Sequence, residues 1–129
     1  MARVMLVEDD AATCALLTVQ LRRHRHLVLA VESAESALAS IATLGLPDVA
    51  IVDVGLPGKD GVALLEELRQ QLGRRPLGVV VMSAGPPPDP ERFVLGARER
   101  FLAKPVGMAE LLAAVDEVCA AGPATAAAG

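Results

Sequence analysis

The chain is poor in aromatic residues, with no tryptophan or tyrosine and two phenylalanines among its 129 residues. Hydrophobic residues nevertheless make up 53% of the sequence, so any core must be built from Leu, Val, Ile and Ala. A chain of this length is sufficient for one domain with one sizeable core. We therefore expect a single domain packed through aliphatic side chains.

Cysteine is also scarce, since only Cys14 and Cys119 are present. Two cysteines are too few for a disulfide framework, and the N-terminus MARVMLVEDD turns acidic without a signal-peptide pattern. These features favour a cytoplasmic protein with reduced thiols. We expect both cysteines to be small core residues on two helices.

Long apolar runs and an excess of positive charge are absent. The longest stretch without a charged residue, Pro76–Pro88, ends in three prolines, whereas a membrane-spanning helix needs roughly 20 apolar residues. The formal net charge is −4, and phosphate backbones select clustered Lys and Arg. The sequence therefore argues against a membrane or a nucleic acid as the partner of this domain.

What the sequence does contain is an alternation of short β-rich runs with helical patterns. The predicted strands are Arg3–Val7, Leu27–Val31, Val49–Val52, Leu77–Met82 and Phe101–Ala103. The predicted helices are Asp10–His24, a helix capped by Ser33 and ending near Leu44, Asp60–Leu72, a short Glu91–Leu95, and Met108–Ala121. The proline-rich segment Pro86–Pro90 permits only a loop or a helix start.

Five strands alternating with five helices predict a parallel sheet with helices on both faces. Right-handed crossovers leave few topologies. We expect an α/β flavodoxin-like (βα)5 three-layer sandwich with strand order 2-1-3-4-5. The expected domain covers residues 1–122, and residues 123–129 are expected to be a disordered tail or a linker stub.

Polar residues gather where the predicted strands end, and ligands of open parallel sheets bind beyond those carboxyl ends. The polar residues that follow strands one, three, four and five are Glu8, Asp9, Asp10, Asp53, Ser83 and Lys104. Asp10 is interpreted as a helix cap. Clustered carboxylates repel each other unless a cation lies between them, and Mg²⁺ suits such a site because it keeps coordination positions for phosphate.

This constellation also suits phosphoryl transfer. A carboxylate such as that of Asp53 can attack phosphorus and give an aspartyl phosphate. The ammonium of Lys104 would supply positive charge to the phosphoryl oxygens, and the hydroxyl of Ser83 could donate a hydrogen bond to one of them. By contrast, the run Arg22–His26 is interpreted as a solvated helix end, where cations favour the helix dipole.

The segments VMLVEDD, DVAIVDVGLPGKDG, VVVMSA and FLAKP resemble, in order and spacing, the signature of response-regulator receiver domains. The resemblance covers the chain up to Gly122. It implies that Asp53 is the phosphoacceptor and that Lys104 binds the phosphoryl group. The other implied roles are Mg²⁺ binding by Glu8, Asp9, Asp53 and the backbone carbonyl of Gly55, a switch hydroxyl on Ser83, a switch aromatic at Phe101, and a cis peptide at Pro105.

The leading functional hypothesis is a signalling switch that turns over no metabolite. A sensor histidine kinase or a phosphotransfer protein would phosphorylate Asp53, and the altered surface would bind a downstream protein or output domain, with a homodimer left open. The alternative is a phosphorylation-independent interaction module, motivated by the Pro86–Pro90 segment. A haloacid-type phosphohydrolase is disfavoured because Gly55 stands where such enzymes carry a second Asp.

Overall fold

The computed structural model describes residues 2–54, 63, 64, 66, 67, 70, 77–83 and 98–120. Its strands are β1 (Arg3–Val7), β2 (Leu27–Val31), β3 (Val49–Asp53), β4 (Gly78–Ser83) and β5 (Glu99–Ala103). Its helices are α1 (Ala11–Arg23), α2 (Ala34–Leu44) and α4 (Met108–Ala120). All neighbouring strands pair in parallel, in the order β2-β1-β3-β4-β5. The predicted fold class and strand order are confirmed.

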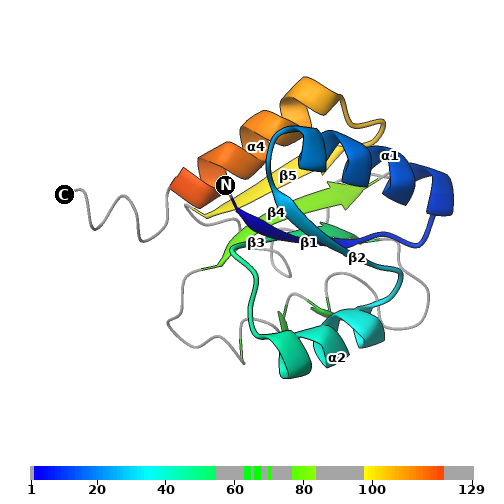
Figure 1. The fold of residues 1–129 in the computed structure, drawn as a ribbon, viewed down its shortest axis with the longest axis vertical. Helices are drawn as coiled ribbons and strands as arrows, with labels where there is room; N and C mark the ends of the chain where they lie inside the picture. The colour runs from blue at the N-terminus through cyan, green and yellow to red at the C-terminus, as the bar shows by residue number, and fades with distance from the viewer. Residues whose placement is uncertain are drawn as a thin grey trace.

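The sheet lies between two layers of helices, with α1 and α4 over one face and α2 over the other (Figure 1). The core on the α1 and α4 side includes Leu21, Val80 and Val115, while the core on the α2 side includes Ile41 and Val81. Strands β3 and β4 are buried along their whole length. Central strands covered on both faces account for the nearly continuous apolar runs in the sequence.

Two helix starts are fixed by the side chains that the sequence analysis predicts as caps. The carboxylate of Asp10 accepts a hydrogen bond from the backbone N–H of Thr13 at 2.8 Å, and α1 begins at the next residue. The hydroxyl of Ser33 accepts from the N–H of Ser36 at 3.1 Å at the start of α2. Such bonds satisfy amides that have no partner within the helix.

Four strand bounds differ from the predictions. Strand β4 begins at Gly78, one residue after the predicted Leu77. Asp53 and Ser83 are the last residues of β3 and β4 instead of the first residues after them, and β5 begins at Glu99, two residues before the predicted start. The cause is backbone pairing, because Asp53 is in register with Met82, and Glu99 with Val79. A ladder continues as long as backbone groups pair, even where the side chains are polar.

Some predicted elements fall on residues that are only partly described. Within the predicted helix Asp60–Leu72, the structure describes five residues, all of them helical: Ala63, Leu64, Glu66, Glu67 and Gln70. Leu64 is fully buried. The predicted loop Pro86–Pro90, the short helix Glu91–Leu95 and the tail 123–129 lie outside the described residues. Among the helices of the described part, none has the length and apolar character needed to cross a bilayer.

Candidate functional site

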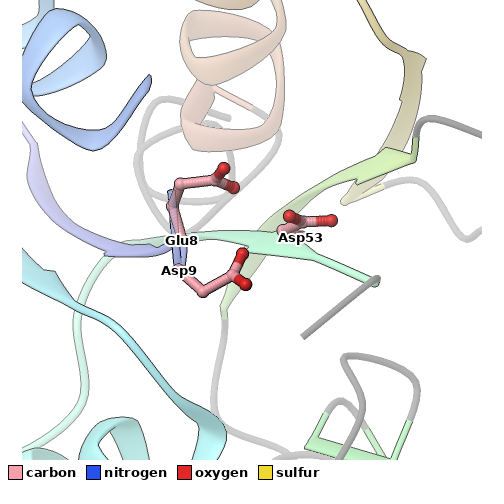
Figure 2. A group of neighbouring side chains, drawn as sticks. All are labelled: Glu8, Asp9 and Asp53. Atoms are coloured by element: carbon pink, nitrogen blue, oxygen red, sulfur yellow. The ribbon is translucent and has the colours of Figure 1, made fainter. Parts of the chain in front are cut away.

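Three carboxylates meet at the carboxyl edge of the sheet. Glu8 and Asp9 follow β1, and Asp53 ends the neighbouring strand β3. One oxygen from each lies within 4.8 Å of the others, and Figure 2 shows the three side chains converging from the two strand ends. Glu8 and Asp53 are buried, whereas Asp9 is exposed. The structure thus brings together the three acids that the strand-end argument selects.

Lys104, the residue directly after the carboxyl end of β5, also belongs to this cluster. Its Nζ lies 2.9 Å from Oδ2 of Asp53 and 3.4 Å from each carboxylate oxygen of Glu8. The backbone N–H of Lys104 donates to the carbonyl of Ser83 at 2.7 Å, which fixes the start of the lysine stem against β4. The peptide between Lys104 and Pro105 is cis, as the family resemblance implies. The contact with Glu8 was not predicted.

Burial and charge set the protonation of the cluster. Burial, together with the hydrogen bond and negative charge of Asp53, raises the pKa of Glu8 to about 7, and Lys104 opposes this shift. Burial lowers the pKa of Lys104, but the hydrogen bonds and negative charges of Asp53 and Glu8 outweigh this effect and leave that pKa above its ordinary value. The cluster therefore holds three acids and one ammonium, which contacts two of them, and the excess negative charge favours a bound cation.

The donor set fits a divalent cation that prefers oxygen. Carboxylate oxygens are the ligands of Mg²⁺ and Ca²⁺, and Glu8 is only 2% exposed, so its anionic form needs compensating charge nearby. Glu8, Asp9 and Asp53 would hold such an ion from two strand ends. The further predicted ligand, the backbone carbonyl of Gly55, lies outside the described residues.

Ser83 and Phe101 occupy neighbouring positions on β4 and β5. Ser83 is buried at the last position of β4, one residue beyond the partner of Asp53 in the ladder. Phe101 is paired with Val81 and packs, partly buried, against the core on the α2 side. The hydroxyl of Ser83 therefore lies at the carboxyl ends of the strands, where the acids are. Phe101 lies two positions before the end of its strand.

Two grooves adjoin the cluster. One, of about 490 Å³, is lined by Glu8 and Asp9 together with Cys14 of α1 and Glu32 beyond β2. The other, of about 470 Å³, is lined by Lys104 with mainly apolar residues, among them Leu16 of α1. Acids and lysine thus line grooves on the surface of the molecule, where a group carried by another molecule can approach.

The family model of the response regulator receiver domain matches residues 4–116 of the chain. The chain belongs to this family. An acidic cluster such as Glu8, Asp9 and Asp53 is typical of the Mg²⁺ site of receiver domains and is consistent with a phosphoacceptor site. Receiver domains are signalling modules that partner with histidine kinases or phosphotransfer proteins, and the domain is accordingly no enzyme in the classical sense.

Curated relatives agree with the family but are longer than this chain. The sensory/regulatory protein RpfC of Xanthomonas campestris pv. campestris is 39% identical over 113 residues, which are 85% of this chain and 15% of RpfC. The virulence transcriptional regulatory protein PhoP of Salmonella typhimurium is 36% identical over 113 residues, or 88% of this chain and 50% of PhoP. The chain therefore spans half or less of these two relatives.

Solved structures show the same fold. A candidate response regulator from Chloroflexus aurantiacus J-10-fl has 31% identity and a TM-score of 0.79, covering 92% of this chain and 98% of that one. A CheY-like receiver domain protein from Methanospirillum hungatei JF-1 has 24% identity and a TM-score of 0.80, covering 92% and 94%. The second likeness is evidence for the fold alone.

Proposed function

We propose that the chain is a phosphorylation switch in which Asp53 accepts a phosphoryl group from a sensor histidine kinase or a phosphotransfer protein. One observation carries the proposal: Lys104 Nζ lies 2.9 Å from Asp53 Oδ2, in a cluster that also contains Glu8 and Asp9. A carboxylate nucleophile, a fixed cation and further acidic ligands are what phosphoryl transfer to an aspartate requires.

In the proposed step, a carboxylate oxygen of Asp53 attacks phosphorus on the donor's phosphohistidine. The new O–P bond forms as the P–N bond breaks, and the donor imidazole leaves with the electron pair of that bond. Lys104 neutralises charge on the transferring oxygens. Mg²⁺ held by Glu8, Asp9, Asp53 and the carbonyl of Gly55 would add positive charge at those oxygens. Attack of water on the phosphorus of the aspartyl phosphate breaks the O–P bond, releases inorganic phosphate and returns the free carboxylate.

The proposed output is a change of the surface near β4 and β5. The hydroxyl of Ser83 would donate a hydrogen bond to a phosphoryl oxygen, and Phe101 would reposition with it. The edge position of Ser83 and the partly buried ring of Phe101 support these roles. A downstream protein or an output domain would bind the changed surface. In this proposal residues 1–122 form the switch domain and residues 123–129 are its tail or linker. The proposed location is the cytoplasm.

The test is incubation with acetyl phosphate and Mg²⁺, followed by intact mass and mapping of the modified peptide. Asp53→Asn keeps the shape of the side chain but removes the anion, so labelling should vanish while the fold remains. Lys104→Ala should still accept some label without a change in the environment of Phe101. Label on Asp9 or Ser83, or undiminished label on Asp53→Asn, would contradict the proposal.

The phosphorylation-independent alternative makes the opposite prediction, namely no label on the wild-type chain under the same conditions. Its motive, the Pro86–Pro90 segment, lies outside the described residues. The contact of Lys104 with both Asp53 and Glu8 argues against it, because a module without phosphoryl chemistry has no need for that arrangement.

A further inference from the structure

Strand β2 forms one edge of the sheet, and among the described residues it pairs only with β1. Leu27 N–H donates to the carbonyl of Ala2 at 2.9 Å, and the carbonyl of Val31 accepts from Glu8 N–H at 3.0 Å. In a parallel ladder alternate residues direct both backbone groups to the same neighbour. The two residues of β2 that alternate with these, Val28 and Ala30, therefore direct their backbone groups away from β1.

The same edge exposes large apolar side chains. Leu27 and Leu29 are 56% and 37% exposed, and Leu44 at the end of α2 is 58% exposed. These three leucines line a groove of about 150 Å³ together with Met5 and Pro47. Residues at alternate strand positions share one face of a sheet. An open row of backbone groups beside exposed leucines is a template for another strand.

Opposite charges flank this edge. The exposed residues Arg22, Arg23 and Arg25 precede β2, and the exposed residues Glu32 and Glu35 follow it. A second β2 aligned antiparallel would bring each basic end next to an acidic end. A parallel alignment would bring like charges together. The edge is therefore complementary to itself under a two-fold rotation, which is the symmetry of most homodimers.

We propose that two copies of this chain associate by antiparallel pairing of their β2 strands, centred on Leu29. In this register Val28 lies opposite Ala30 of the partner subunit, and the two exchange N–H···O bonds in both directions. Leu29 lies opposite the partner's Leu29 as a non-hydrogen-bonded pair, with Cα atoms about 4.5 Å apart. The two sheets become one, and the leucines of both edges cover each other.

One contact must change for this pairing to form. The guanidinium of Arg22 lies 3.4 Å from the carbonyl of Val28, where it covers one outward group of the edge. In the dimer that carbonyl accepts from the partner's Ala30, and Arg22 turns toward Glu32 of the partner subunit. An exchange of a weak contact at 3.4 Å for a backbone hydrogen bond and an ion pair favours the dimer.

The first test is the mass of the full chain in solution, measured by sedimentation equilibrium over a range of concentrations. Leu29→Asp should weaken dimerisation by about tenfold or more, because two carboxylates would meet on the two-fold axis. Leu16→Asp is the control, since Leu16 is as exposed as Leu27, at 56%, but lies on α1. Labelling of Asp53 by acetyl phosphate should be unchanged in Leu29→Asp, which separates this inference from the proposed function.

Charge exchange tests the antiparallel direction. In a homodimer of Glu32→Lys, the new lysine after β2 would face the arginines before β2 of the partner subunit. In a homodimer of Arg25→Glu, the new acid before β2 would face the acids after β2 of the partner subunit. Each variant alone should dimerise more weakly than the wild type. An equimolar mixture should recover dimers, because every basic end then faces an acidic one. Failure of the mixture to recover them would exclude the proposed direction.

Cross-linking tests the register, in a chain whose native cysteines are replaced by Cys14→Ala and Cys119→Ala. Leu29→Cys should form an intermolecular disulfide readily, because the paired Cα atoms lie within disulfide range. Leu27→Cys should not, since its two copies would be four strand positions apart, about 13 Å. A wild-type chain that is monomeric at every concentration, or equal cross-linking at both positions, would overturn the proposal.

Discussion

Glu8 is a buried acid whose position is not explained by its contribution to the stability of the fold. Its carboxylate is almost fully buried, and burial together with Asp53 raises its pKa to about 7. A buried acid of this kind has no packing advantage over an apolar residue. Its position beside Lys104 and Asp53 is explained by what the cluster can bind, because functional sites are where local rules of stability are broken.

Arg25 is strained in its backbone. Its φ is 68°, in the left-handed region that is unfavourable for residues with a Cβ by about 1–2 kcal/mol. Arg25→Gly relieves this strain but increases the conformational entropy of the unfolded chain. We therefore expect a net gain of about 0.5 kcal/mol in the free energy of unfolding. Urea denaturation measures it. Arg25→Ala is the control and should give no gain, whereas equal gains for both variants would point to the lost charge.

His26 was not predicted to be buried. The run that contains it reads as a solvated helix end, yet the residue is only 9% exposed. Its Nδ1 accepts a hydrogen bond from the backbone N–H of Ala2 at 3.2 Å, and its Nε2 lies 4.0 Å from Oδ1 of Asp116. Both partners are remote in sequence, so only the folded chain reveals that this histidine connects the residue before β1 to α4.

The burial of His26 makes stability depend on pH. Burial lowers the pKa of His26 below its ordinary value of 6.5, and Asp116 opposes the shift. As the pH falls through 6.5 the unfolded chain takes up a proton before the folded one, so this contribution to stability is complete above that pH and is lost below it. His26→Asn retains an acceptor for Ala2 but does not titrate, so its unfolding free energy should vary less between pH 7 and pH 5.

The matched control is His24→Asn at the exposed C-cap of α1. The charge of His24 is the smallest of the effects that lower the pKa of His26, so this variant should keep most of the pH dependence of the wild type. Guanidinium denaturation at several pH values measures both variants. An unchanged pH slope in His26→Asn would show that another group is responsible for the dependence.

At the scale of elements, hydrophobic periodicity and caps are sufficient to predict most bounds. Strands β1 and β2 and helix α2 begin and end where the sequence predicts. The sequence does not reveal how far a strand continues into polar residues, because the backbone ladder and not the side chain decides it, as at Ser83 and Glu99. Nor does an apolar run show that Leu27 and Leu29 face solvent, because that follows from the edge position of β2.

Gly78 of β4 packs against helix α4 and has the least room for a side chain among the described glycines. A Cβ at this position would lie 2.8 Å from Cγ2 of Val118 and 3.2 Å from its backbone carbonyl carbon. Gly78→Ala should therefore destabilise the domain by about 1–3 kcal/mol, because the helix backbone cannot yield as a flexible side chain could. The midpoint of urea denaturation at constant m-value measures the loss.

Gly107 provides the control for this prediction. It precedes α4, and the nearest atom to an added Cβ would be Cβ of Glu110 at 4.0 Å, an ordinary contact. Gly107→Ala should change the free energy of unfolding by no more than about 0.5 kcal/mol. Similar losses at both positions would mean that backbone freedom, and not contact with Val118, decides the effect.

For the whole molecule, the alternation of strands and helices was sufficient to predict the sheet order, and the order was sufficient to predict which acids meet. Asp53 and Glu8 are far apart in sequence but belong to neighbouring strands. The pKa of Glu8 and its contact with Lys104 could not be predicted from the sequence. Both depend on distances of a few ångströms between side chains at the ends of β1, β3 and β5. Topology is thus more predictable than electrostatics.

Because two strands assemble the acidic cluster, only the folded chain offers it to a cation, and Mg²⁺ should stabilise the fold. A tenfold excess over its dissociation constant corresponds to about 1.4 kcal/mol, or a rise of about 3–6 °C in the midpoint of thermal unfolding. Asp9→Asn should raise the midpoint without Mg²⁺, since it removes negative charge but keeps the contacts of Lys104 with Glu8 and Asp53. It should also lose most of the rise with Mg²⁺.

The control for this prediction is the next residue in the chain. Asp10 is an exposed acid that caps α1, and Asn is as good a cap as Asp. Asp10→Asn should therefore keep both the fold and the full rise with Mg²⁺, which calorimetry at constant ionic strength can measure. If Asp9→Asn keeps the rise, the cation binds elsewhere. If both variants lose it, Mg²⁺ acts by screening the net charge of −4 and not through a site built by two strands.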